Sequence, residues 1–526
     1  MMRNLVFSVL LVFHLFFVNT LVTSAQTTPV SPGPIRFRIT ARAELLPTST
    51  SGRLVVFMTQ SAEKPTSLIG NFDPRIQVAG SGPVRLIPGQ ALEVNPDATL
   101  AFPQPFSKAP AGKYLIQVWF DSATSPTTGL DQGDLVSAIT PVDNLNPAST
   151  APVELSLTDR IGEGQRFEET DSIKLVEFQS PMLSAFWGHP MTIRAGIVLP
   201  PSYLKDPKRT YPTVYNVHGF GGNHFGAKYA GPKLLKGMAD GKYPEMIHVF
   251  LDASFVTGHH VFADSVNNGP WGRALTEEFI PYLEKNFRQL PKPAARFLTG
   301  HSSGGWSTLW LQITYPDFFG GTWSTSPDPV DFRSFSGINA SPGTTDNLYR
   351  AADGKPHPLV RIGGQVVFTI EAYTLKEEIE TDGLGGQLSS FEWVFSPKDR
   401  DGRPMKLFDR TTGEFDQRVL KAWQKYDIRL TLEKNWATLG PKLAGKIHIV
   451  CGEADTFYLE GAVRLLRDFL REKGSDAVVE LVPDRGHFDL YKPFETYKEG
   501  LETRIFHEME TAFQSASKPG KSKVKK

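Results

Sequence analysis

The stretch Arg296-Phe297-Leu298-Thr299-Gly300-His301-Ser302-Ser303-Gly304-Gly305 combines a short apolar run, a sharp turn and the start of a helix. The helix is predicted to continue to Thr314, because Pro316 stops it. Glycines on both sides of Ser302 let the strand and helix backbones approach where a Cβ atom would clash. A serine on such a turn projects its hydroxyl above the edge of a sheet. The stretch therefore predicts an α/β fold with Ser302 as a nucleophile. A nucleotide-binding turn is the weaker interpretation, because the sequence lacks a phosphate-loop pattern with its lysine.

Short apolar runs alternate with helical stretches from about residue 172 to 513, which is typical of a mostly parallel, doubly wound sheet with helices on both faces. Two segments, 275–287 and 462–471, have apolar residues at helical spacing and are predicted crossover helices. Eight strands are predicted, and an antiparallel arrangement is open for the first two: Leu175–Phe178, Ile193–Leu199, Thr213–Val217, Ile247–Leu251, Arg296–Thr299, Gly321–Ser324, Ile447–Cys451 and Val478–Val482.

The region before this sheet has a different pattern. A chain of 526 residues exceeds what one hydrophobic core usually organises, so a second folded unit or a large insertion is expected. Apolar and polar residues alternate over 35–42, and 114–120 is apolar and aromatic-rich, as in strands. We predict a smaller all-β, sandwich-like domain over 26–157, with 143–151 as its last loop or a linker.

An insertion of about 327–419 interrupts the α/β region, which we assign to 172–513. It is rich in loop residues, and we expect it to form a lid or a pocket wall over the active-site end of the sheet. Its segment Asp399-Arg400-Asp401-Gly402 lacks the remaining acidic positions of a calcium loop, so we interpret it as a solvated turn and predict no metal.

The N-terminus resembles a secretory signal, because Arg3 precedes an apolar run over 5–18 and the small residues 23–25. We predict a signal peptide over 1–25, a mature chain from about Gln26, and a secreted or periplasmic location. An uncleaved membrane anchor is the alternative, and no later segment is apolar enough to span a bilayer. At the other end, 514–526 is a predicted basic, disordered tail.

The charge balance and the cysteine content argue against several classes of function. The 56 Lys and Arg residues balance the 56 Asp and Glu residues, so no basic field is available to attract nucleic acid or anionic membrane. The single cysteine, Cys451, ends an apolar run and cannot form an intrachain disulfide. It is interpreted as a small buried hydrophobic residue rather than a nucleophile.

A serine nucleophile needs a base and an acid, which in this type of fold come later in the chain. Asp455 follows the strand predicted at 447–451, and His487 follows the strand predicted at 478–482. We predict that His487 takes the Ser302 proton and that Asp455 fixes the tautomer of the His487 ring. Glu453 is the competing acid, and Asp484 is interpreted as a turn residue.

Backbone amides must also stabilise the oxyanion that forms when the serine attacks a carbonyl. The loop Asn216-Val217-His218-Gly219-Phe220-Gly221-Gly222 follows an earlier strand and is suited to this task. We predict the amides of Phe220 and Ser303 as donors, with Gly219 or Gly221 as alternatives to Phe220. His218 itself is interpreted as a residue that orients the loop.

Three residues are candidates for substrate binding: His259, His260 and Trp271. Core packing is the alternative for these and other aromatic residues. A metal is not predicted here, because no third ligand stands at a helical spacing from the two histidines.

These motifs together resemble the esterase D-like branch of the α/β-hydrolases, which includes feruloyl and acetyl-xylan esterases, enterochelin-esterase-like proteins and mycolyl transferases. The resemblance covers about 172–513 apart from the insertion. Its features are the 218–222 loop, the segment Asn268-Gly269-Pro270-Trp271-Gly272, the Gly-His-Ser-Ser-Gly-Gly turn, the acid loop 452–455 and the pair Gly486-His487. It implies an α/β-hydrolase fold, acyl transfer without metal or organic cofactor, and Ser302, Asp455 and His487 as the triad.

The predicted function is therefore an exported serine esterase that forms an acyl-enzyme. Its substrate would be a small-molecule or carbohydrate ester, such as a sugar, polysaccharide or phenolic ester. Two alternatives are an acyltransferase that passes the acyl group to an alcohol or sugar, and an inert cell-surface or carbohydrate-binding protein. The sequence does not define the oligomeric state.

Overall fold

The computed structural model describes residues 35–60, 65–70, 73–122, 130–147, 149 and 151–517. The predicted signal peptide over 1–25 lies outside the described residues, as do residues 518–526 of the predicted tail. Residues 514–517 belong instead to helix α11 (Leu501–Ser517), so the prediction that the tail begins at 514 is wrong. The helix continues because no glycine or proline interrupts the sequence before Pro519.

The eight-stranded sheet predicted from the apolar runs is present, with the order β10-β11-β13-β12-β18-β19-β22-β23. β10 and β11 pair antiparallel, β11 also pairs antiparallel with β13, and the later neighbours pair parallel. This is the mostly parallel sheet predicted from the sequence. Its strands are β10 (Ile173–Gln179), β11 (Thr192–Val198), β12 (Thr213–Val217), β13 (Ile247–Leu251), β18 (Arg296–His301), β19 (Gly321–Thr325), β22 (Ile447–Gly452) and β23 (Val478–Val482).

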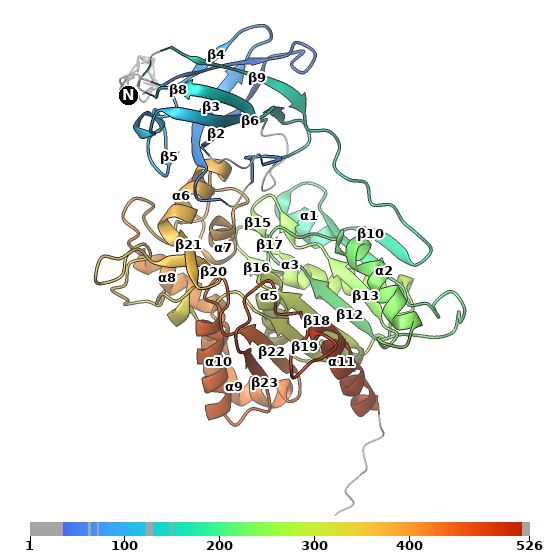
Figure 1. The fold of residues 1–526 in the computed structure, drawn as a ribbon. Helices are drawn as coiled ribbons and strands as arrows, with labels where there is room; N and C mark the ends of the chain where they lie inside the picture. The colour runs from blue at the N-terminus through green and yellow to red at the C-terminus, as the bar shows by residue number, and fades with distance from the viewer. Residues whose placement is uncertain are drawn as a thin grey trace, which may run out of the picture.

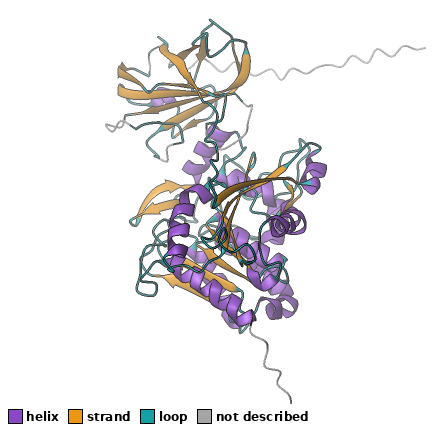
Figure 2. Cartoon of the chain, turned by 90° about the vertical axis from the view of Figure 1, so that its right-hand side faces the viewer, coloured by secondary structure: helices purple, strands orange, loops and turns teal. Residues whose placement is uncertain are grey.

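Helices cover both faces of this sheet (Figure 2). Apolar side chains of α2 and α11 form one core cluster with side chains of β12, β18 and β23. On the other face, α4 and part of α5 pack on alternate residues of the same strands, and α9 and α10 extend that layer. The helices are α1 (Pro181–Trp187), α2 (Gly226–Ala239), α3 (Trp271–Arg273), α4 (Ile280–Asn286), α5 (Ser303–Thr314), α9 (Ile428–Leu443) and α10 (Glu460–Glu472), and a π-helical turn at Ala274–Phe279 joins α3 to α4.

The described residues before 161 form a nine-stranded sheet with the order β4-β1-β9-β7-β6-β2-β3-β5, and β8 pairs with β6. Hydrogen bonds join these strands into one sheet, and residues of β1, β2, β6 and β9 share one buried core. The strands are β1 (Phe37–Ala41), β2 (Thr50–Thr59), β3 (Gln77–Leu86), β4 (Leu92–Val94), β5 (Ala101–Phe102), β6 (Gly112–Asp121), β7 (Leu135–Ser137), β8 (Thr140–Leu145) and β9 (Val153–Arg160).

Most of the segment 143–151 is the last loop of this sheet, between β8 and β9, and the linker alternative is wrong because β9 follows it and extends to Arg160. β9 lies beside β1 in parallel register, so a strand from the end of this region closes against the first one. The connection to the α/β region is therefore the segment 161–172. The Asn and Pro residues near 146 mark a turn inside the sheet rather than its end.

The insertion after residue 327 is more regular than its loop-rich composition suggests. It contains β20 (Pro358–Ile362), β21 (Gln365–Thr369), α6 (Ile370–Thr381), α7 (Gln387–Phe395) and α8 (Gln417–Trp423). Thr369 begins α6 by accepting a hydrogen bond from the Ala372 amide, as an N-cap threonine does. The glycine pairs are the turns between these elements, at positive φ at Gly363 and Gly364 for example.

Helix α6 connects the two sheets. It lies between the N-terminal sheet and the α/β region (Figure 1), and it contacts β3 and β5. The Arg53 guanidinium on β2 donates a hydrogen bond of 2.7 Å to the Ile379 carbonyl near the end of α6. The N-terminal sheet therefore supports the insertion from the side opposite to the hydrolase sheet. None of the helices in the described ranges has the length and hydropathy needed to cross a bilayer.

A substitution of Phe297 tests the packing of β18, the strand that precedes Ser302. The Phe297 side chain is 1% exposed and packs in the core between β18 and α11. Phe297→Ala is expected to lower the free energy of unfolding by about 3–5 kcal/mol, measured by chemical denaturation. Leu204→Ala, at a side chain that is 62% exposed, is the control and should change it by less than about 0.5 kcal/mol. Equal losses for the two variants would contradict the proposed core.

Candidate active site

Ser302 lies on a strained turn between β18 and α5. Its backbone has φ 58° and ψ −124°, in a region that residues with a side chain rarely adopt. The turn depends on glycine, because a Cβ atom on Gly304 would lie 2.0 Å from the Val217 carbonyl oxygen, and one on Gly300 would lie 2.3 Å from the Gly304 carbonyl oxygen. The Ser302 amide donates to the Thr325 carbonyl at 3.0 Å, which fixes the turn to the next strand. The sequence thus forces the serine onto the tight turn between strand and helix that was predicted for a nucleophile, where the residue is 8% exposed.

The predicted acid and base lie together. His487 Nδ1 and Asp455 Oδ2 are 2.9 Å apart, and both side chains are nearly fully buried. Burial alone would raise the pKa of Asp455, but the hydrogen bond and charge of His487, with the Phe457 amide, hold that pKa below its ordinary value. An ionised Asp455 fixes the His487 tautomer with the proton on Nδ1, which leaves Nε2 free to act as a base.

Three aromatic rings surround His487. His301 lies at a ring-centroid distance of 4.3 Å, Phe457 at 4.9 Å and Phe488 at 5.2 Å. His301 is itself buried, which lowers its pKa to about 3, so it remains a neutral ring beside the base. The rings restrict the orientation of His487 without adding a charge.

The Ser302 hydroxyl donates to a different group from the predicted base. It lies 3.4 Å from Asp328 Oδ1, and no hydrogen bond joins it to His487 in the part of the chain that the structure describes. The Ser303 hydroxyl donates to the other carboxyl oxygen, Oδ2, at 2.5 Å. A rotation of the Ser302 side chain about its Cα–Cβ bond is therefore the step that would bring the nucleophile to the base.

Asp328 was missed by the sequence analysis. It is 3% exposed, and burial raises its pKa from 3.8 to about 6. The available signal was its position: it follows β19, as Asp455 follows β22, and the carboxyl ends of neighbouring parallel strands meet at one edge. The Pro residues on both sides, Pro327 and Pro329, made the segment look like the start of a loop rather than part of the site.

The predicted oxyanion loop lies against the nucleophile. A Cβ atom on Gly219 would be 3.2 Å from Ser302 Cβ, so the 218–222 backbone approaches the serine closely. His218 has Nδ1 2.7 Å from the Gly219 carbonyl oxygen, while its Nε2 accepts from the Ala253 amide at 2.8 Å. These contacts hold the loop in place. The amides of Phe220 and Ser303 remain the predicted donors to the oxyanion. Neither amide donates a hydrogen bond to another backbone acceptor within the described residues.

The three candidate substrate-binding residues lie in a packed interior. His259 donates from Nε2 to the His218 carbonyl at 2.9 Å, and burial is the main reason that its pKa is well below the ordinary value. His260 stacks on Trp271 with centroids 3.7 Å apart, and burial lowers its pKa to about 3. None of the three lines the cavity beside Asp328; Trp271 lines a separate cavity with Arg194. Their nearest link to Ser302 is the contact of His259 with the oxyanion loop.

The remaining alternatives have structural explanations. Glu453 pairs with Arg464 at 3.1 Å, whereas Asp455 is the carboxylate that lies within hydrogen-bond distance of His487 Nδ1. Asp484 has φ 57° in a turn. Cys451 is fully buried, and burial raises its pKa well above the ordinary value, so it is a poor nucleophile. Among the described residues, no group of three His, Cys, Asp or Glu side chains is arranged to hold a metal ion.

The sequence model of a family described as "Putative esterase" matches residues 184–476, which is more than half of the chain. The chain belongs to this esterase family. The predicted resemblance to esterase D-like α/β-hydrolases is thereby confirmed. No curated protein sequence matches the chain.

Solved structures similar to this family member include three hydrolases. A ferulic acid esterase from Anaeromyces mucronatus in complex with ferulic acid is 13% identical, covering 67% of this chain and 95% of its own, with a TM-score of 0.35. An S-formylglutathione hydrolase from Agrobacterium tumefaciens is 14% identical, covering 64% and 94%, with a TM-score of 0.38. A fluorophosphonate-binding serine hydrolase from Staphylococcus aureus is 14% identical, covering 64% and 98%, with a TM-score of 0.37.

Asp328→Asn is expected to stabilise the protein. Because the pKa of Asp328 is raised from 3.8 to about 6, its ionised form disfavours the folded state above pH 6, and this penalty disappears as the pH falls through the range between the two values. The variant should gain at most about 3 kcal/mol of unfolding free energy at about pH 8 and little at about pH 4. Denaturant unfolding of both proteins at the two pH values measures this. A gain that grows toward low pH would contradict it.

Proposed function

We propose that this esterase-family protein is an exported serine hydrolase that cleaves carboxylic esters through an acyl-enzyme. The hydrogen bond of 2.9 Å between buried His487 and Asp455, at the same sheet edge as the strained Ser302, is the observation that carries the proposal. A base–acid pair of this kind is needed to activate a serine hydroxyl, which is otherwise a weak nucleophile.

In the proposed reaction, the Ser302 hydroxyl leaves Asp328, donates to His487 Nε2 and attacks the ester carbonyl. His487 takes the proton, and Asp455 stabilises the imidazolium that forms. The amides of Phe220 and Ser303 donate to the oxyanion. Collapse of this intermediate expels the alcohol, which receives the proton from His487. A water molecule, activated by His487 in the same way, then releases the acid and restores Ser302.

The substrate class proposed is a sugar, polysaccharide or phenolic ester. The chain provides an apolar cavity beside the triad, which suits an aromatic or aliphatic part of such an ester. The family membership supports ester cleavage, whereas the complex with ferulic acid is a property of the similar structure from Anaeromyces mucronatus.

Ser302→Ala tests the nucleophile. The variant should lose at least about 10³-fold in kcat/KM toward p-nitrophenyl and feruloyl esters, because a missing nucleophile leaves only binding and oxyanion stabilisation. It should also lose labelling by a fluorophosphonate probe. Ser517→Ala, at an exposed position in the last turn of α11, is the matched control and should keep both. Ester turnover that survives Ser302→Ala, or a wild-type protein without labelling, would overturn the proposal. Product analysis with added alcohols separates hydrolysis from acyl transfer.

Export makes a separate prediction. The full chain expressed in a secreting bacterial host should appear outside the cytoplasm with a mature N-terminus near Gln26, as determined by mass spectrometry. Leu10→Arg places a charge in the apolar run and should retain the uncleaved chain in the cell. An uncleaved wild-type chain in the membrane fraction would favour the anchor alternative.

A further inference from the structure

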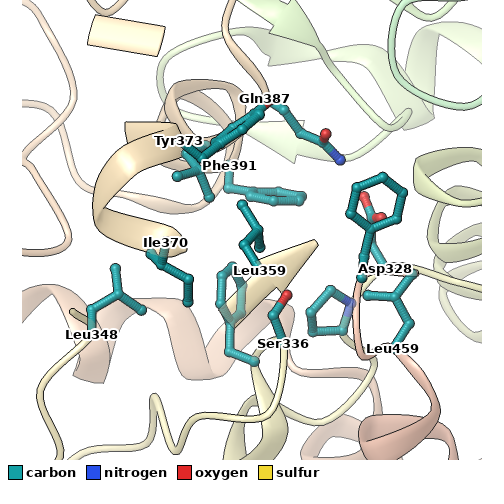
Figure 3. A pocket seen from close by; sticks show the side chains of 13 residues that line it. Asp328, Ser336, Leu348, Leu359, Ile370, Tyr373, Gln387, Phe391 and Leu459 are labelled. Atoms are coloured by element: carbon teal, nitrogen blue, oxygen red, sulfur yellow. The ribbon is translucent and has the colours of Figure 1, made fainter. Parts of the chain in front are cut away.

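A cavity lies between the nucleophile and the insertion, with an empty volume of about 550 Å³ that includes open solvent. Residues of α6 and α7 form one side, and Asp328 and Leu459 lie on the opposite side (Figure 3). The lining is apolar apart from a few polar groups and consists of Asp328, Pro329, Phe335, Ser336, Leu348, Leu359, Ile370, Tyr373, Gln387, Leu388, Phe391, Phe457 and Leu459. Phe457 also contacts the His487 ring, so one wall of the cavity adjoins the proposed catalytic base.

Asp328 is the only acidic or basic side chain in this lining. Its two hydrogen-bond donors are neutral hydroxyls, those of Ser302 and Ser303. Within the described residues, no lysine or arginine forms an ion pair with it, and the titratable groups that act on its pKa are His487, which lowers it, and Asp455, which raises it. A buried carboxylate without a counter-ion is costly, and proteins normally pair such a group. At neutral pH this one is mostly ionised, since its pKa is about 6.

The carboxylate also has unused capacity as an acceptor. Its two oxygens offer about four lone-pair positions, and the serines occupy two. The bond from Ser302 is 3.4 Å long, whereas hydroxyl–carboxylate bonds are usually about 2.7 Å, so it is weak and readily replaced. When Ser302 turns to His487, Oδ1 loses this donor and faces the cavity next to the reacting carbon.

We propose that Asp328 determines substrate specificity: it accepts a hydrogen bond from a hydroxyl or ammonium group adjacent to the scissile ester, while the apolar remainder of that group fills the cavity. This inference rests on the proposed esterase function. The adjacency follows from the position of Oδ1 beside the nucleophile, because only a donor one or two bonds from the ester can reach it while Ser302 attacks the carbonyl.

The test compares matched esters that differ by one group. One series carries hydrogen, hydroxyl or ammonium on the acyl carbon next to the carbonyl of a hexanoyl ester. The other carries the same groups on the second carbon of the alcohol, because a hydroxyl or amino group on the carbon that bears the ester oxygen would give an unstable acyl hemiacetal or N,O-acetal. In one series, the wild-type kcat/KM should favour the hydroxyl and ammonium esters over the unsubstituted ester by about 10- to 100-fold, as expected for a hydrogen bond to a charged group. The series that shows the preference identifies which half of the ester, acyl or alcohol, enters the cavity. The donor with the higher kcat/KM shows whether Asp328 selects a hydroxyl or an ammonium group.

Asp328→Asn should remove most of this preference in kcat/KM and should affect the ammonium ester most because the charge is lost. Asp427→Asn is the matched control: Asp427 is also buried with a pKa of about 6, but it caps α9 and lies outside the cavity lining. It should leave the ratio between substrates unchanged. In the wild type, the preference for ammonium should decline as the pH falls below about 6, because a neutral carboxyl does not attract a cation.

Equal kcat/KM for all members of both series in the wild type, or a preference that survives Asp328→Asn, would overturn the inference. The first outcome does not depend on the folding of any variant, because it uses the wild type alone. The unsubstituted ester separates this inference from the proposed function. If the wild type cleaves it and Ser302→Ala does not, the esterase proposal stands whatever the substituted esters show.

Discussion

The close crossing of two backbones beneath Ser302 is the constraint on which the active site depends. The first turn of α5 passes so near the end of β12 that a Cβ atom on Gly304 would lie 2.0 Å from the Val217 carbonyl oxygen. This contact brings the proposed oxyanion loop, which follows β12, against Ser302, the proposed nucleophile, which precedes α5. It also holds Ser302 at φ 58°, a conformation that would relax if the helix could move away. The geometry of the serine, the loop and the first amide of α5 therefore depends on Gly300 and Gly304 together with the hydrogen bond from the Ser302 amide to the Thr325 carbonyl.

Much of this arrangement was predictable because it is encoded in short stretches. The central strands are buried on both faces, so they form apolar runs that are recognisable without a partner. Ser302, Asp455 and His487 could be predicted because each follows such a run, and strand ends in a parallel sheet converge. Asp328 follows a strand in the same way. Its role depends on two serines 25 and 26 residues away, and no local pattern reveals that its carboxyl receives both hydroxyls.

The structures of the insertion and of the N-terminal sheet were harder to predict from the sequence, for a different reason. Helix α6 is only weakly amphipathic, because it is covered on more than one side: Ile370 and Tyr373 line the cavity, while the Ile379 carbonyl accepts from Arg53. A helix enclosed between two sheets does not show the single apolar stripe that sequence patterns detect. Likewise, β9 pairs with β1 over more than a hundred residues of sequence, and the Asn and Pro residues before it resemble a linker.

The ionised Asp328 presents an electrostatic conflict that helps explain the site. An ester hydrolase must stabilise a negative oxyanion next to Ser302, and two like charges about 5 Å apart repel by roughly 3 kcal/mol at an effective dielectric constant of about 20. An apolar residue at position 328 would avoid this repulsion and would also remove the cost of burying the carboxylate. A bound donor changes the balance, since it disperses or neutralises the carboxylate charge while the oxyanion forms. The penalty is then relieved only for substrates that carry the donor. The carboxylate therefore slows the reaction of simple esters but not that of esters that carry the donor. Because this difference arises in the transition state, it appears as a difference in kcat/KM between the two kinds of substrate.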